Sequence, residues 1–299
     1  MLGDPVLINL IVAHGLEAKP LIALFDLQPQ EDRDNVYVSN SGVRLIVTGM
    51  GRQNVEYSLA QWVETKPSAR RDMAWLNVGI AGHQNLAVGD TLIANKIISG
   101  PDNESVFPTP IISGLRTGTV ITVDRPELNY PKDAAYDMEA FAFWRSAAAF
   151  GPLDLVQSYK IVSDNPDSST DKVTPDLITE LIDSASKEIE GLVLQLKALA
   201  AKQQSLVSDP PAFVSAKANY RLSVTQEIQL RRLCHRFYAL QMGESLEVIL
   251  SASHRDSRAL IGALHTALGH TDGNPGREGG ESLSRVEAGG GQTERNQAS

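Results

Sequence analysis

The sequence contains a single cysteine, Cys234, among its 299 residues. One cysteine excludes an intrachain disulfide and a zinc site built on several cysteines, and we expect Cys234 to be a small buried hydrophobic residue. Long hydrophobic runs are also missing. The longest, residues 6–13, is interrupted by Asn9 and is far shorter than the roughly 20 residues that cross a bilayer. We therefore expect no membrane-spanning segment and no membrane partner.

An excess of positive charge is absent as well. The formal net charge is −9, so the overall field repels nucleic acid and anionic lipid. Residues 205–270, which contain Arg231, Arg232, His235 and Arg236, carry a net charge of only +2. We expect that basic cluster to be a solvated helix face or a protein-docking surface, and no nucleic-acid partner.

Three common nucleotide and hydrolase motifs are missing. The chain has no GxGxxG turn, no GxxxxGK[ST] phosphate loop and no GxSxG elbow, which removes the main sequence support for dinucleotide oxidoreductases, P-loop NTPases and α/β-hydrolases. His14 and His83 lack carboxylates at metal-ligand spacing. We expect no metal and no cofactor. The N-terminal residues lack the basic region of a signal peptide, which predicts a cytoplasmic protein.

Short apolar runs alternate with amphipathic segments in the first two thirds of the chain. Near-continuous apolar runs are typical of strands covered on both faces, and alternation with helices predicts an α/β domain whose sheet is largely parallel. We expect strands at residues 6–13, 43–48, 73–79, 91–98, 118–123 and 155–162, and helices at 53–64, 138–150 and 175–201. Thr174 and Pro175 suit the N-cap and first position of the last of these helices.

The remainder of the chain divides into two parts. Asp209-Pro210-Pro211 within a polar stretch marks a linker, and a small helical extension with three helices follows it, the first capped by Ser223 and Gln226. Residues 271–299 are glycine-rich and have few aliphatic side chains, which predicts a disordered tail. The predicted organisation is a domain over 1–204, a helical extension over 205–270 and the tail.

Five short motifs stand in a recognisable order. They are Ala13-His14-Gly15-Leu16-Glu17, Asn77 to Gly82, Val88-Gly89-Asp90, Asp137-Met138-Glu139-Ala140 and Lys160 to Asp164. Together they resemble the purine nucleoside phosphorylase and nucleosidase superfamily over about residues 5–201, and they are most similar to methylthioadenosine/S-adenosylhomocysteine nucleosidases. The resemblance implies a three-layer domain with a central mixed, largely parallel sheet, a nucleoside substrate and a homo-oligomer.

The resemblance also assigns roles to residues. Asp164 matches the general acid that protonates the departing purine, Glu139 the carboxylate that binds the ribose hydroxyls, and Glu17 the base that orients water. Further matches are substrate contacts: Met138, Ile80, Ala81, Gly82, Ser163 and Lys160. Such a reaction requires a protonated leaving group, a stabilised cationic sugar and an oriented nucleophile, and the three carboxyl groups supply one candidate for each.

Four departures from the family pattern keep alternatives open. Ile80 stands in place of a serine, Asn77 in place of an arginine found in hexameric phosphorylases, and Lys160 in place of another arginine. The loop 123–127 lacks the aromatic residue that stacks on adenine, although Tyr130 is near in sequence. We therefore predict hydrolysis of the N-ribosyl bond. Phosphorolysis, with phosphate bound by Arg52 or Lys160, and nucleoside binding without turnover are the alternatives.

Overall fold

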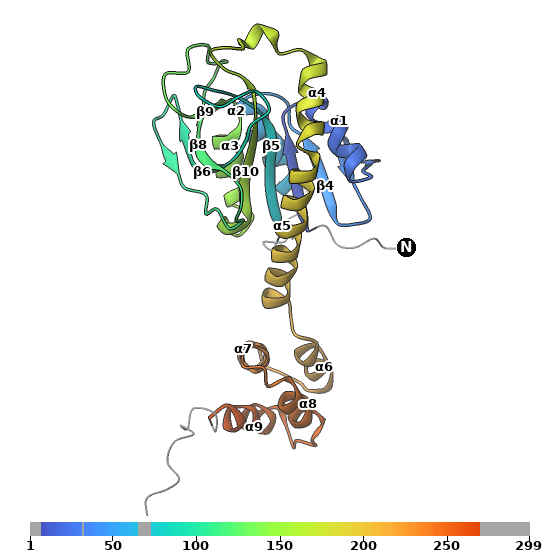
Figure 1. Cartoon of the computed structure of the whole chain (residues 1–299). Helices are drawn as coiled ribbons and strands as arrows, with labels where there is room; N and C mark the ends of the chain where they lie inside the picture. The colour runs from blue at the N-terminus through green and yellow to red at the C-terminus, as the bar shows by residue number, and fades with distance from the viewer. Residues whose placement is uncertain (1–6, 32, 65–72, 270–299) are drawn as a thin grey trace, which may run out of the picture. The chain divides into compact units, whose positions relative to one another are not determined.

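The computed structural model describes residues 7–31, 33–64 and 73–269 (Figure 1). These residues form two compact units, one ending at Ser208 and the other beginning at Asp209. The predicted tail at 271–299 lies outside the described residues. No described helix is both long enough and apolar enough to cross a membrane.

The first unit is built on a mixed sheet. Its strands are β1 (Ile8–Val12), β2 (Gln28–Gln30), β3 (Arg33–Val38), β4 (Val43–Val47), β5 (Ala74–His83), β6 (Thr91–Ser99), β7 (Ser105–Val106), β8 (Thr117–Thr122), β9 (Ala135–Asp137) and β10 (Val156–Asp164). Strands β4, β1, β5 and β10 are neighbours and run parallel. All six predicted strands are present. The short strands β2, β3, β7 and β9 were not predicted.

The long strand β5 joins an open sheet to a closed ring. Its first half pairs with β1, and its last residues, Gly82 and His83, pair with β9. Strand β10 pairs with β5 on one side and with β6 on the other, and β8 connects β6 to β9. The strands β5, β10, β6, β8 and β9 therefore close on themselves, which brings the carboxyl ends of β5 and β10 beside the end of β9.

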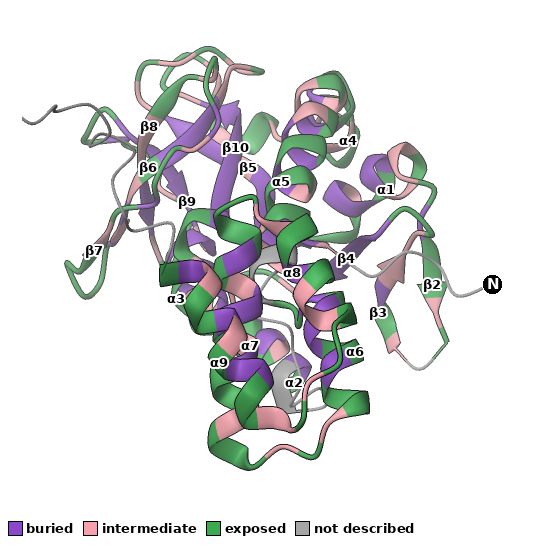
Figure 2. Ribbon diagram, turned by 90° about the horizontal axis from the view of Figure 1, so that it is seen from below, coloured by how far each residue is buried: buried purple, intermediate pink, exposed green. Residues whose placement is uncertain are grey.

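Helices cover both faces of the sheet. The helices of this unit are α1 (Gly15–Leu24), α2 (Arg52–Glu64), α3 (Ala140–Ala148), α4 (Pro175–Ser184) and α5 (Ser186–Val207), with short 3-10 turns at Leu153–Leu155 and Thr170–Lys172. Alternate residues of β1 enter different cores: Leu10 packs with α1, α4 and α5, and Ile11 packs with α2 and α3. Because successive strand residues point to opposite faces, this gives three layers, as predicted, with buried strands between exposed helix surfaces (Figure 2).

The single helix predicted at 175–201 is wrong in one respect: it is two helices. Helix α4 ends at Ser184 and α5 begins at Ser186. The hydroxyls of these two serines donate to the main-chain oxygens of Leu181 and Ile182 at 2.8 and 3.3 Å. Serine hydroxyls that bond back to the preceding turn commonly bend a helix. Helix α5 also continues past the predicted boundary at residue 204, up to Val207.

The second unit consists of helices around a separate apolar core. They are α6 (Pro211–Asn219), α7 (Val224–Ala239), α8 (Gly243–Ser251) and α9 (Ser257–Gly269). The predicted capping box of Ser223 and Gln226 is present at the start of α7. Cys234 is buried in this core, as predicted, and burial raises the pKa of its thiol to about 11. Helix α6 was not predicted, because its two N-terminal prolines indicated a linker.

Candidate active site

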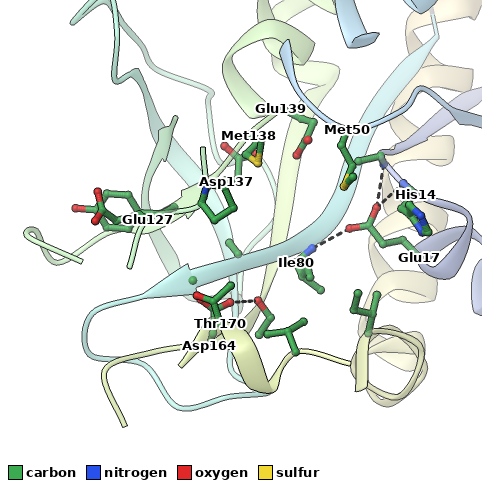
Figure 3. Close-up of a pocket in the computed structure, with 18 of the residues that line it drawn as sticks. His14, Glu17, Met50, Ile80, Glu127, Asp137, Met138, Glu139, Asp164 and Thr170 are labelled. Atoms are coloured by element: carbon green, nitrogen blue, oxygen red, sulfur yellow. Dashed lines mark hydrogen bonds between the residues drawn. The ribbon is translucent and has the colours of Figure 1, made fainter. Parts of the chain in front are cut away.

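A cavity of about 270 Å³ opens where four parallel strands end. Its walls come from Ala13 after β1, Met50 after β4, the segment 80–82 of β5 and residues 163–164 of β10. Residues 137–139, at the junction of β9 and α3, form a further part of the wall (Figure 3). The carboxyl ends of strands in open α/β sheets are a common place for ligand sites, and this cavity lies at such a position.

The three predicted catalytic carboxyl groups, Glu17, Glu139 and Asp164, all line this cavity although they are far apart in the sequence. Five of the six predicted substrate contacts line it too: Met138, Ile80, Ala81, Gly82 and Ser163. Lys160 does not line the cavity. It is buried behind the wall, 1% exposed. The structure thus brings the predicted residues together and places one of them in a supporting position.

Glu17 is fixed by main-chain donors. It is the third residue of α1, and its Oε2 accepts hydrogen bonds from the N–H groups of Ala13 and His14 at 2.9 and 3.0 Å, which completes a capping box with His14. Its Oε1 accepts from the N–H of Ile80 at 3.1 Å. Burial raises the pKa of Glu17, and the charge of Lys160 and these three donors oppose that rise. Such a carboxyl is well suited to take a proton from water.

Lys160 balances a group of buried acids. Its ammonium lies 2.8 Å from Oδ2 of Asp137, and both side chains are almost fully buried. Asp137 also accepts from the Thr122 hydroxyl and from the N–H of Ala140, each at 2.7 Å. Burial alone would lower the pKa of Lys160, but Asp137, Glu139 and Glu17 together raise it. Lys160 therefore remains a cation at neutral pH and holds the nearby carboxylates in place.

Glu139 stands at the N-cap of α3, where its side chain makes no cap hydrogen bond to its own helix. Its Oε1 instead accepts from the N–H of Gly51 at 2.6 Å. Burial, reinforced by the charge of Asp137, raises the pKa of Glu139 to about 7, although Lys160 and Gly51 oppose the rise. A desolvated carboxyl group is costly unless something binds it, which is consistent with a ligand-binding role.

Asp164 is surrounded by hydroxyl groups. Its Oδ1 accepts from the Ser163 hydroxyl, and its Oδ2 accepts from the hydroxyls of Tyr130 and Thr170, the latter at 2.8 Å. No such set of donors was predicted. Tyr130 was noted as an aromatic residue near the loop 123–127, but its ring packs edge-on against Tyr136, 6.0 Å between centroids, and Tyr136 is the ring that lines the cavity.

Glu127 and His14 also line the cavity, and neither was predicted as a site residue. Glu127 lies on the Asp164 side of the cavity and His14 on the Glu17 side (Figure 3). His14 caps α1 through its Nδ1, which accepts from the N–H of Leu16 at 3.1 Å. His83 is used in the same way at the end of β5, where its Nδ1 accepts from Asn85 and Leu86. Within the described residues, no group of three or more His, Cys, Asp or Glu side chains is placed so that it could hold a metal ion.

The two cations considered as phosphate ligands, Arg52 and Lys160, are already paired with carboxylates. None of the described lining residues is a lysine or arginine. Lys160 binds Asp137, and Arg52 lies 2.7 Å from Asp102 and 3.9 Å from Asp124. Asn77, which stands where some phosphorylases have arginine, donates to the main-chain oxygen of Ile11 and accepts from the Ser158 hydroxyl. The described residues therefore present no free cation to an anion in this cavity.

The fold is similar to that of solved 5′-methylthioadenosine/S-adenosylhomocysteine nucleosidases, as the resemblance of the motifs predicted. Among similar solved structures is the 5′-methylthioadenosine/S-adenosylhomocysteine nucleosidase (MTAN) of Chlamydia trachomatis, with 20% identity, a TM-score of 0.52, and 64% of this chain matched to 98% of that one. The MTAN of Neisseria meningitidis has 17% identity, a TM-score of 0.50, and coverage of 62% and 97%. The Helicobacter pylori MTAN has 13% identity, a TM-score of 0.50, and coverage of 64% and 99%.

No known family model and no curated protein matches the chain. Identities of 13 to 20% show a shared fold. The activity has to be argued from the cavity itself.

Proposed function

We propose that the first unit hydrolyses the N-ribosyl bond of a purine-type nucleoside. The observation that carries this proposal is the convergence of Glu17, Glu139 and Asp164 on one cavity of about 270 Å³. Two of the similar structures hold 5′-methylthioadenosine or methylthio-immucillin-A, which supports a nucleoside as the ligand class. In this proposal the second unit takes no part in the chemistry.

The three carboxyl groups divide the reaction between them. Asp164 delivers a proton to the base as the bond between the base nitrogen and the anomeric carbon breaks. Glu139, with Met138 beside it, binds the sugar hydroxyls and faces the positive charge that develops on the ring. Water adds to the anomeric carbon and gives a proton to Glu17. The products are the neutral free base, which carries the proton from Asp164, and the free sugar, and exchange of protons with solvent returns Asp164 and Glu17 to their starting forms.

The charge distribution favours water over phosphate as the nucleophile. Phosphate binding in a protein cavity uses arginine or lysine side chains or several free main-chain N–H groups. Arg52 and Lys160, the two candidates, are each engaged by a carboxylate at 2.7 to 2.8 Å. The N–H of Ile80 donates to Glu17. A dianion at this position would also face the carboxylates of Glu17 and Glu139.

Nucleoside binding without turnover is the second candidate, and Ile80 favours it. The side chain of Ile80 lines the cavity at a position where the family has a serine, so no hydroxyl is available there to hold the attacking water. If this loss abolishes turnover, the cavity still accepts a nucleoside, and the protein acts as a nucleoside-binding module.

The test is the release of free base from a panel of purine nucleosides, including 5′-methylthioadenosine, with and without phosphate. We expect phosphate-independent release that falls by about 10² to 10⁴ in Asp164→Asn, the usual contribution of a general acid. Asp171→Asn is the matched control, because Asp171 is exposed and does not line the cavity. Release that requires phosphate would establish phosphorolysis. Binding of nucleosides without any release would establish the binding module.

A further inference from the structure

Tyr130 is held in an unusual conformation between β8 and β9. Its φ is +45°, in the left-handed region that residues with a side chain rarely adopt. It is also 2% exposed. A strained backbone persists when the surrounding structure over-determines it, and such positions cluster at functional sites.

Gly82 makes room for this tyrosine at the end of β5. A methyl group added at Gly82 would lie 2.5 Å from Cε1 of Tyr130 and 2.8 Å from Oδ2 of Asp164. These separations are shorter than atomic contact allows, so the ring and the carboxyl group occupy the space that any other residue at position 82 would fill. The backbone of β5, the ring of Tyr130 and the carboxyl of Asp164 form one close-packed set.

The hydroxyl of Tyr130 is hydrogen-bonded to Asp164, the proposed general acid. It donates to Oδ2 of Asp164 and lies 3.1 Å from the hydroxyl of Thr170, which donates to the same oxygen. Tyr130 does not itself line the cavity, whereas Thr170 and Asp164 do. We propose that Tyr130 is a positioning residue that fixes the Asp164 carboxyl group and stabilises its ionised form, making it a stronger acid toward the departing base. This inference rests on the proposed function only in taking Asp164 as the acid.

The physical reason is the direction of the hydrogen bonds. A carboxylate accepts hydrogen bonds from hydroxyl donors more strongly than a neutral carboxyl group does. When Asp164 gives its proton to the base, the new anion receives bonds from Tyr130, Thr170 and Ser163. Burial, with the bond to Asp164, raises the pKa of Tyr130 to about 12, so the phenol keeps its proton and stays a donor throughout the neutral range.

In the described structure, the groups that donate hydrogen bonds to the Asp164 carboxyl group are hydroxyls and not cationic side chains. Glu127, from the same loop as Tyr130, is the other carboxylate that acts on Tyr130, and Tyr136 of β9 contributes an aromatic edge. None of the described lining residues is a lysine or arginine. The hydrogen-bond donors that the described structure places on Asp164 are therefore the hydroxyls of Tyr130, Ser163 and Thr170.

Tyr130→Phe tests the inference, because it removes the hydroxyl and keeps the ring that packs over Gly82. We expect the alkaline limb of the pH–rate profile for base release to move up by about one to two pH units, since a hydrogen bond to a charged group is worth that much, while the plateau at lower pH falls. Thr170→Val removes the second donor to the same oxygen and should move the limb in the same direction.

Tyr159→Phe is the matched control. Tyr159 is a fully buried tyrosine on β10 whose hydroxyl donates to Glu188 at 2.6 Å, outside the cavity. Loss of the Tyr159 hydroxyl should not shift the pH–rate profile for base release. If Tyr130→Phe lowers the rate equally at every pH, Tyr130 has only a structural role and the inference is wrong.

A measurement without substrate separates this inference from the proposed function. The carboxyl ¹³C signal of Asp164, in protein labelled with ¹³C-aspartate and assigned by its loss in Asp164→Asn, is titrated in the wild type and in Tyr130→Phe. An upward shift of the midpoint supports the inference even if no nucleoside is cleaved, in which case the proposed function fails alone. An unchanged midpoint overturns the inference whatever the activity.

Discussion

The two ends of the cavity hold their carboxyl groups in different ways. At one end, which we call the lysine end, Lys160 and main-chain N–H groups hold Glu17, Asp137 and Glu139. At the other, the hydroxyl end, Asp164 receives its hydrogen bonds from Ser163, Thr170 and Tyr130. Apart from the Thr122 hydroxyl that donates to Asp137, the lysine end relies on a fixed charge and main-chain donors, whereas the hydroxyl end relies on groups that can rotate.

This difference suits the chemistry proposed for each end. A hydroxyl can donate to a carboxylate and accept from a carboxylic acid, so Asp164 can lose and regain a proton without leaving a charge unpaired. An ammonium ion and main-chain N–H groups can only donate. The donors at the lysine end therefore oppose protonation of Glu139, the residue that faces the cationic sugar in the proposed reaction.

Removing the charge of Lys160 should destabilise the lysine end and produce the largest of the predicted effects. In Lys160→Met, Asp137 keeps its hydrogen bonds to Thr122 and Ala140 but loses its buried counter-ion. We expect a loss of about 3 to 5 kcal/mol in the free energy of unfolding, as for other buried pairs from which one partner is removed. All three tryptophans, Trp62, Trp75 and Trp144, lie in the first unit, so urea unfolding followed by tryptophan fluorescence reports on this unit in the full chain.

Arg116→Met is the control for that experiment. Arg116 pairs with Asp90 at 3.0 Å, but both side chains are well exposed. Exposed ion pairs contribute about 0 to 1 kcal/mol, so this variant should unfold almost as the wild type does. Equal losses in the two variants would show that burial of Lys160 adds nothing and that the contrast between the two ends is not electrostatic.

The raised pKa of Glu139 gives a smaller effect with a defined pH dependence. A carboxyl whose pKa is about 7 in the folded protein and 4.5 ordinarily binds its proton more tightly when folded, so the folded state loses stability as pH rises from about 4.5 to 7. Glu139→Gln should therefore stabilise the first unit by about 2 to 3 kcal/mol at pH 8 and by little at pH 5. The same variant should lower base release.

Two further measurements test the predicted pH dependence of the Glu139→Gln variant. The first is the same urea titration on Glu56→Gln, an exposed residue of α2, which should change stability by less than about 0.5 kcal/mol at either pH. The second is the Glu139→Gln titration repeated at pH 5. A gain of equal size at pH 5 and pH 8 would mean that Glu139 is not ionised in the wild type at pH 8, and the lysine end would then carry one charge fewer than the structure indicates.

The sequence alone was sufficient to predict the strands that are both long and largely buried. Strands β1, β5 and β10 are almost entirely buried, and most residues of β1 and β5 are apolar, as expected of strands that are covered on both faces. Elements without this signal were missed. Strand β2 contains Pro29, β9 has three residues, and helix α1 has Pro20 in its interior, which normally indicates a helix boundary.

In the candidate site as well, the sequence predicted some features and not others. Glu17, Glu139 and Asp164 were found because each lies in a short motif next to the end of a strand. The contacts that hold them are not encoded locally: Tyr130 reaches Asp164 across 34 residues, and Gly51 reaches Glu139 across 88. No periodicity or spacing carries such a pairing. The pairing of Tyr130 with Asp164 follows from the closed ring of strands, which brings the ends of β5, β9 and β10 together.

The smallest predicted effect compares the two ends directly through the glycines of β5. Alanine at position 82 would place its methyl group 2.5 Å from the Tyr130 ring, and alanine at position 79 would place it 2.9 Å from Oε1 of Glu17. Overpacking of this kind costs about 1 to 2 kcal/mol. Gly82→Ala should cost more than Gly79→Ala, because the ring belongs to a strained and fully buried residue and the carboxylate ends a longer side chain.

Gly191→Ala is the control for both glycine variants, since Gly191 lies within α5 and has nothing within 4 Å of an added methyl group. It should stabilise the unit by about 0.5 to 1 kcal/mol, the usual gain in a helix interior. The two variants in β5 should also separate in activity, because Gly82→Ala displaces the acid and Gly79→Ala displaces the base. If both unfold as Gly191→Ala does, neither end is as closely packed as the contrast requires, and the strain at Tyr130 would need another cause.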